Sequence, residues 1–289
     1  MTSPTKPRTR STSTSPKSKP SSAKLVELGK HFWEHLNKLS RPEQRQLLAR
    51  ERYPDVWWEV PTPINEFITS PDYLNMGDEV WPSIREELDE ALALDEQGEF
   101  VFSEVVLLKA IGAGKSMTSS IIFAYLVYWL ICLKDPQKFF GLARGSKIAF
   151  LNMAPSASKA KDVVFHEVKT RVENSPWFRR YYPPDPHVKS KLLFDHVRVD
   201  EEGKELESYR GQKNIAVIPG NSSRNMAIGY NVFGGVIDEA AFFETMENIG
   251  KSSTERTDVL YDAIQRRIFS PVFFFIAIYL CLRIFRNHR

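Results

Sequence analysis

Cysteine is scarce in this chain, which contains two cysteines among 289 residues. Cys132 and Cys281 both lie in apolar runs, so the sequence supplies neither a disulfide framework nor a zinc cluster, and we expect a reducing compartment. Acidic residues are absent from residues 1–24, and so is the apolar stretch that a secretory signal requires. These absences argue against a secreted, disulfide-rich protein.

The first 23 residues are rich in Ser, Thr, Pro, Lys and Arg. Such a composition cannot bury a hydrophobic core, so we expect residues 1–23 to form a disordered basic tail. The tail either contacts the phosphates of nucleic acid weakly or keeps the chain soluble. Residues 1–24 contain six lysines and arginines and the whole chain has a net charge of +3, so the remaining residues have a net charge of −3.

Residues 24–98 are predicted to form a helical and aromatic N-terminal segment. Apolar residues recur at helical spacing in its first part, and Pro42 separates them from a second helix that contains Leu47 and Leu48. An acidic amphipathic helix is predicted at residues 84–94. The aromatic side chains between these helices are expected to be mostly core, the alternative being that one of them stacks on an adenine base. They include Trp57, Trp58, Phe67, Tyr73 and Trp81.

Residues 109–116 have the sequence KAIGAGKS and lie between an apolar run typical of a strand, residues 100–108, and a long apolar helix. They match the phosphate-loop pattern G-x-x-x-x-G-K-[ST] except at the first glycine, where Lys109 stands. Such a loop directs several backbone N–H groups at a phosphate, while its lysine reaches the β- and γ-phosphates and its serine binds Mg²⁺. The alternative is an ordinary turn. The predicted nucleotide-binding residues are Gly112, Ala113, Gly114, Lys115 and Ser116.

A second motif, residues 231–239, is an apolar strand pattern that ends in Asp238 and Glu239. An NTPase needs a carboxylate at the end of a neighbouring strand to hold Mg²⁺, and a second group to orient or deprotonate the attacking water. We therefore assign Asp238, with Ser116, to the metal, and Glu239, with Lys115, to catalysis. The alternative is an ordinary helix N-terminus, where the helix dipole favours acids.

Further strands are predicted at residues 147–152, 191–195 and 214–219. Strands that alternate with helices indicate an α/β fold with a mainly parallel, helix-covered sheet. The phosphate loop and Asp238 then share the C-terminal edge of the sheet, where ligands bind in such folds. We place this P-loop NTPase domain at residues 99–270, after the small helical segment.

Several motifs occur in a fixed order along the chain. They are residues 111–116 (IGAGKS), 148–152, 175–178 (SPWF), 219–220, 222–223, 229–231, 236–240 (VIDEA) and 261–267 (YDAIQRR). In this order they resemble the ATPase domain of the large terminase subunit of tailed bacteriophages, the motor that drives DNA into a preformed capsid.

This resemblance implies a P-loop NTPase of the additional-strand type that hydrolyses ATP with Mg²⁺. It implies as partners double-stranded DNA, a small terminase subunit and further copies of the chain on a capsid portal. The location would be the host cytoplasm, during virion assembly or from an integrated prophage, without stable membrane association. Many family members carry an arginine finger just before the glycine that corresponds to Gly229. Here that position is Ile228, and although Arg224 lies nearby, the finger stays unassigned.

Residues 271–289 depart from the family pattern. Large terminases continue with a coupling motif and a nuclease domain that holds a cluster of acids, whereas residues 273–282 contain no acid, so nuclease activity is not expected. This apolar tail is a marginal membrane segment, a buried strand, or the end of a truncated or frameshifted product. We favour the last interpretation and predict that the tail is poorly packed.

Three hypotheses about function remain open. The first is an ATPase motor domain of a terminase that drives DNA packaging. The second is a helicase-like P-loop ATPase that acts on nucleic acid. The third is an inactive, truncated terminase fragment that only binds nucleotide or partners.

Overall fold

The computed structural model describes residues 36–102, 104–109, 112–154, 165–188, 190–194, 214–221, 231–237 and 274–280. Residues 1–40 and residues 41–289 form two compact units, and all the helices and strands named below belong to the second. The predicted basic tail, residues 1–23, lies outside the described residues.

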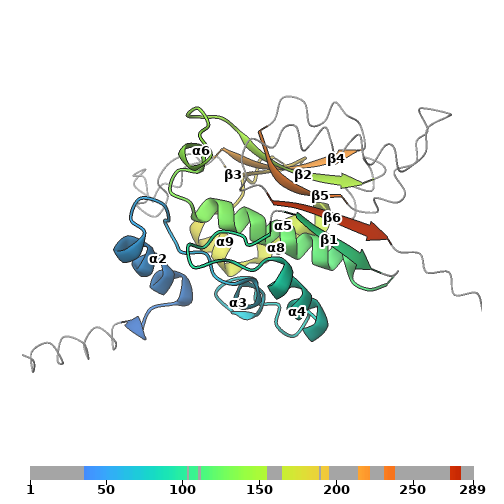
Figure 1. Ribbon diagram of the computed structural model, residues 1–289, viewed down its shortest axis with the longest axis horizontal. Coiled ribbons are helices and arrows are strands. Elements are labelled where there is room, and N and C mark those ends of the chain that lie inside the picture. Colours follow the sequence, from blue (N-terminus) through green and yellow to red (C-terminus); the bar gives the residue numbers. More distant parts are fainter. Residues whose placement is uncertain are drawn as a thin grey trace, which may run out of the picture. The chain divides into compact units, whose positions relative to one another are not determined.

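Six described strands form a single sheet (Figure 1). Five of them run parallel to one another, and the short edge strand runs antiparallel to the strand beside it. In spatial order the strands are β1 (Glu104–Lys109), β6 (Phe274–Leu280), β5 (Asn231–Ile237), β2 (Ile148–Ala154), β4 (Ile215–Asn221) and β3 (Leu192–Phe194). The predicted α/β fold with a mainly parallel sheet is therefore confirmed.

Strand β6 corrects one prediction made from the sequence. Instead of a poorly packed tail, its residues pair in parallel with β1, from Glu104 opposite Phe275 to Lys109 opposite Leu280, and with β5 on the other side. An unbroken run of apolar residues, such as residues 274–280, is typical of an interior parallel strand. β6 separates the strand before the phosphate loop from the strand before the acidic pair, and it is thus the additional strand. That the chain is truncated or frameshifted stays a prediction.

The 18-residue helix α5 (Lys115–Cys132) is the core helix of this unit. Every side chain from Thr118 to Cys132 is buried, and Trp129 stacks on Phe233 of β5 with the ring centroids 5.6 Å apart. The helix is long and apolar enough to cross a membrane, but 83% of its 18 residues are buried inside the protein. Burial on all sides therefore accounts for its composition, as predicted.

Three shorter helices follow α5 along the chain. They are α6 (Pro136–Phe139), α8 (His166–Asn174) and α9 (Pro176–Tyr181). α8 contacts both α5 and α9, and α5, α8 and α9 lie together on one side of the sheet (Figure 1). Ser175 ends α8 and begins α9, where its hydroxyl accepts a hydrogen bond from the backbone N–H of Phe178.

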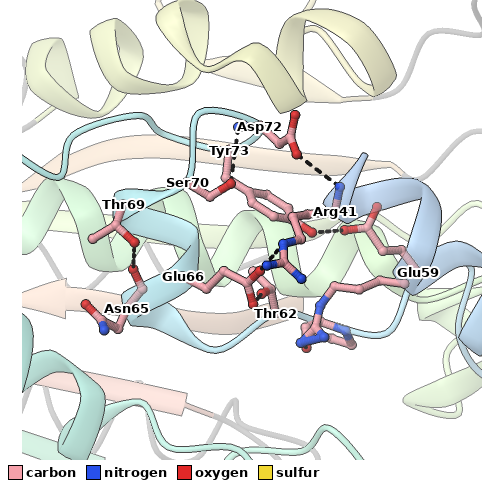
Figure 2. A network of polar contacts seen from close by, with 11 residues as sticks. Arg41, Glu59, Thr62, Asn65, Glu66, Thr69, Ser70, Asp72 and Tyr73 are labelled. Atoms are coloured by element: carbon pink, nitrogen blue, oxygen red, sulfur yellow. Dashed lines mark hydrogen bonds and ion pairs between the residues drawn. The ribbon is translucent and has the colours of Figure 1, made fainter. Parts of the chain in front are cut away.

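The N-terminal segment is helical, as predicted. It contains α2 (Arg41–Arg52), α3 (Ile64–Thr69) and α4 (Pro82–Ala91), and both α3 and α4 contact α5. Figure 2 shows polar contacts that join its parts: Arg41 pairs with Glu66 (Nε to Oε1, 3.5 Å) and its backbone N–H donates to Asp72. Arg41–Arg289 form one compact unit, and the domain boundary at residues 98–99 stays a prediction.

Glu59 links this segment to the core helices by hydrogen bonds. Its carboxylate is fully buried and accepts hydrogen bonds from the hydroxyls of Tyr73 (3.1 Å) and Tyr128 (2.8 Å). The indole N–H of Trp177 (3.0 Å) and the side-chain amide of Gln46 (3.3 Å) also donate to it. These donors come from α2, α5, α9 and the connection between α3 and α4, so a single carboxylate joins four parts of the fold.

Candidate nucleotide-binding site

The phosphate loop begins where β1 ends and leads directly into α5. Gly114 is the residue that caps the N-terminus of α5, with φ +72°, and Gly112 has φ +79°. These are left-handed conformations that residues with a side chain adopt rarely. Both turn glycines predicted from the sequence are therefore required by the backbone.

The N-terminus of α5 is open to a ligand. No side chain caps it at Gly114, so its first N–H groups keep their capacity to bind an anion. A Cβ added at Gly112 would meet no atom within 4 Å, which leaves space around the exposed part of the loop. A helix N-terminus of this kind fits a phosphate group.

Lys115 and Ser116 are the first two residues of α5, and both are half-buried. Among the described residues, Lys115 has no acidic partner and the Ser116 hydroxyl has no hydrogen-bond partner. The hydroxyls of Thr118 and Ser119, in contrast, donate to the carbonyls of Gly114 (3.0 Å) and Lys115 (2.9 Å). Within the described part of the chain, the ammonium and the first hydroxyl of the helix are thus not engaged by other side chains, and their binding of phosphate and a divalent cation stays a prediction.

Lys109 occupies the position of the first glycine in the standard motif. Its side chain is only 7% exposed, and its ammonium forms an ion pair with the carboxylate of Glu87 on α4. Lys109 is therefore held by a partner within the protein, whereas Lys115 has no acidic partner among the described residues. Reasoning from the sequence missed Glu87, because nothing in the local pattern of α4 distinguishes this acid from the other acids on the helix.

Helix α4 also contacts the other end of the loop. A Cβ added at Gly114 would lie 3.0 Å from Cδ1 of Ile84. Ile84 is buried, and it precedes Glu87 by about one helical turn. Gly114 is thus favoured both by its backbone conformation and by the packing of α4 against it.

The C-terminal ends of β1 and β5 lie at the same edge of the sheet. Both strands run parallel to β6, and Ala277 of β6 pairs with Val106 on one side and with Ile237 on the other. Asp238 and Glu239 directly follow Ile237 but lie outside the described residues, so their roles stay predictions. Arg224 and Ile228, considered for the arginine finger, are also outside.

The aromatic residues of the N-terminal segment are mostly core, as expected. Trp57, Phe67 and Tyr73 are buried, with at most 1% of each residue exposed. Trp81, directly before α4, is 62% exposed. Stacking on an adenine base stays a prediction, and Trp81 is the exposed residue of the set to which it applies.

The match to a protein family extends over most of the chain. A family model described as "Uncharacterized protein MJ0330, N-terminal P-loop domain" matches residues 32–270. The chain belongs to this family. The match to this P-loop domain includes the phosphate loop, the acidic pair and the helices of the N-terminal segment, and it ends shortly before β6. No curated protein matches the chain.

Large terminases are among the solved structures to which this chain is similar. The large terminase ATPase domain of Thermus phage P74-26 has a TM-score of 0.42 and 15% identity, over 67% of this chain and 68% of that one. A mutant of that domain has a TM-score of 0.38 and 14% identity, over 61% and 58%. The large terminase of a thermophilic bacteriophage has a TM-score of 0.38 and 12% identity, over 61% of this chain and 34% of that one.

Proposed function

We propose that this chain hydrolyses ATP in a Mg²⁺-dependent reaction and acts as the motor domain of a terminase. The observation that carries the ATPase proposal is the loop between β1 and α5. There, two glycines in left-handed conformations lead into a helix N-terminus without a side-chain cap, and Lys115 and Ser116 have no partner among the described residues.

Each residue of the loop has a defined task in this proposal. The backbone N–H groups of residues 112–116 bind the phosphates, and the ammonium of Lys115 stabilises the charge that develops during phosphoryl transfer. Ser116 and Asp238 hold Mg²⁺, which when bound neutralises charge on the β- and γ-phosphates. Glu239 orients the attacking water and accepts its proton.

The motor assignment depends on the sequence motifs that resemble large terminases. In this assignment the chain acts on double-stranded DNA as an oligomer on a capsid portal, together with a small terminase subunit. Contacts with the DNA backbone are then independent of sequence and weaken as the salt concentration rises. The change between ATP-bound and ADP-bound states moves the surface that grips the DNA.

The test is ATP hydrolysis by the purified chain without nucleic acid, with double-stranded DNA and with single-stranded DNA. Lys115→Ala and Glu239→Gln should each lower the hydrolysis rate by at least about 100-fold, because each removes a group that acts on the reacting phosphate or water. Lys138→Ala, which removes an exposed lysine from α6, is the matched control and should retain the native rate.

Two results would overturn parts of this proposal. If the native chain hydrolyses ATP no faster than Lys115→Ala and Glu239→Gln, the chain is not an ATPase, and the inactive-fragment hypothesis replaces it. If single-stranded DNA stimulates hydrolysis and double-stranded DNA does not, the packaging assignment fails and a helicase-like ATPase replaces it.

A further inference from the structure

Helix α4 contacts both ends of the phosphate loop, Lys109 at the N-terminal end and Gly114 at the C-terminal end. At the C-terminal end, Ile84 packs against Gly114 at a distance that leaves little room for a side chain. At the N-terminal end, the carboxylate of Glu87 pairs with the ammonium of Lys109. Ile84 and Glu87 are three residues apart, so they lie close together on one face of the helix.

The direction in which Lys109 points follows from the alternation of side chains along β1. Val105, Leu107 and Lys109 lie on the same face of the strand, and the first two pack against the same core as Ile84 and Leu88 of α4. Lys109 is thereby directed toward α4 and is almost fully buried. A buried ammonium is costly unless a carboxylate pairs with it, and Glu87 supplies that carboxylate.

The two lysines of the loop therefore have different surroundings. Lys109 is buried and paired with Glu87, whereas Lys115 is half-buried and has no acidic partner among the described residues. The pairing leaves one cation of the loop free for the triphosphate and assigns the other to the attachment of α4.

We propose that Glu87 is a positioning residue for nucleotide binding. Through Lys109 it holds the beginning of the phosphate loop, while Ile84 holds Gly114 at the end, and together they fix the loop before a nucleotide arrives. A loop that is already ordered loses less conformational entropy on binding, which raises affinity. This inference depends on the proposed function, because it concerns the binding of ATP at the same loop.

The test is a double-mutant cycle on the equilibrium affinity for Mg²⁺-ATP, measured by isothermal titration calorimetry. Glu87→Gln and Lys109→Met should each weaken ATP binding by about tenfold, which corresponds to about 1.4 kcal/mol. Because the two side chains act through each other, the double variant should also be weakened by about tenfold rather than by about 100-fold. Retention of native affinity by the single variants, or a multiplicative loss in the double variant, overturns the proposal.

Glu43→Gln is the matched control. Glu43 pairs with Arg180 at 2.9 Å and is 33% exposed, as is Glu87, but its pair joins α2 to α9. This variant should bind ATP with native affinity. If it loses as much affinity as Glu87→Gln, the effect arises from general loosening of the fold, and the positioning role is wrong.

Two further comparisons keep the outcome unambiguous. If Glu87→Gln does not fold, Lys109→Met is compared with the double variant, since neither contains the buried cation. Both should fold and bind ATP about tenfold more weakly than the native chain, and native affinity in either one overturns the proposal. Lys115→Ala reports on the proposed function itself. If it binds ATP as well as the native chain does, the nucleotide site is wrong and the inference fails with it.

Discussion

Replacing Glu59 with Gln should remove a pH dependence from the stability of this chain. Glu59 is completely buried, and loss of hydration raises the pKa of its carboxyl group from 4.5 to about 7, although hydrogen bonds from Trp177, Tyr128, Gln46 and Tyr73 act in the opposite direction. The two tyrosines stay neutral over the relevant range, because burial raises the pKa of each hydroxyl as well. Glu59, whose contact with Tyr73 is drawn in Figure 2, is thus the group in this cluster that titrates near neutral pH.

The sign of the effect follows from the two protonation equilibria. The pKa of Glu59 is higher in the folded state, about 7, than in the unfolded state, 4.5, so the folded state binds the proton more tightly. The stabilisation is fully present below pH 4.5 and is lost as the pH rises to about 7. A tenfold change in proton affinity is equivalent to about 1.4 kcal/mol. Between pH 5 and pH 8 the free energy of unfolding should therefore fall by about 2.5 kcal/mol through this group.

The side chain of Gln has nearly the same shape and does not titrate. Its carbonyl oxygen accepts hydrogen bonds from Trp177 and Gln46, while its amide donates to the hydroxyl oxygens of Tyr73 and Tyr128. Subtracting the stability of the native chain from that of Glu59→Gln at each pH cancels the titration of all other groups. The remaining pH dependence of the difference in stability is that of the Glu59 carboxyl group alone.

Urea unfolding at several values between pH 5 and pH 8, followed by tryptophan fluorescence, measures this difference. Glu59→Gln should gain about 2.5 kcal/mol relative to the native chain over this range. If the two stability curves run parallel, the carboxyl group has an ordinary pKa in the folded state. The reasoning from its burial is then refuted.

Two further substitutions test packing and capping. Gly235→Ala should destabilise the fold by about 3 kcal/mol or more, because the added Cβ would lie 2.3 Å from the carbonyl oxygen of Leu151. Gly77→Ala is the control, since its Cβ would meet nothing closer than 3.5 Å. Equal melting temperatures of the two variants would contradict the close approach of β5 to β2. Ser175→Ala should cost about 1–2 kcal/mol in urea unfolding, since its hydroxyl accepts from the N–H of Phe178 at the start of α9 and donates to the carbonyl of Tyr73; a change below about 0.5 kcal/mol would show that these two hydrogen bonds do not contribute.

Most elements of the sheet could be predicted from the sequence, because each is a short apolar run between turn residues. The end of β1 shows the limit of this reasoning. The predicted strand covered residues 100–108, whereas β1 begins at Glu104 and includes Lys109. Phe100 instead forms a bridge with Leu94, three residues after the end of α4. That contact depends on the path of the chain after α4, which cannot be read from the local pattern of apolar and polar residues.

Within the site, the predictable residues are those whose role is set by the local backbone. Gly112 and Gly114 could be identified because a loop that directs its N–H groups at one point needs left-handed turns. Glu87 could not, because its role depends on a contact with Lys109, 22 residues later in the chain. A lysine in place of the first glycine was the available sign that a carboxylate must lie nearby, since a lysine at the end of a buried strand requires a partner.

The C-terminal strand shows why composition alone misled. A run of apolar residues has the same composition in a membrane segment, in an unpacked tail and in an interior parallel strand. The partners of its backbone decide between these alternatives. Among the described strands, β1 pairs only with β6, so without residues 274–280 the strand that leads into the phosphate loop would have no neighbour in the sheet. A P-loop domain whose sequence contains β1 and β5 but no strand between them is incomplete, and that gap identifies the apolar run as the additional strand.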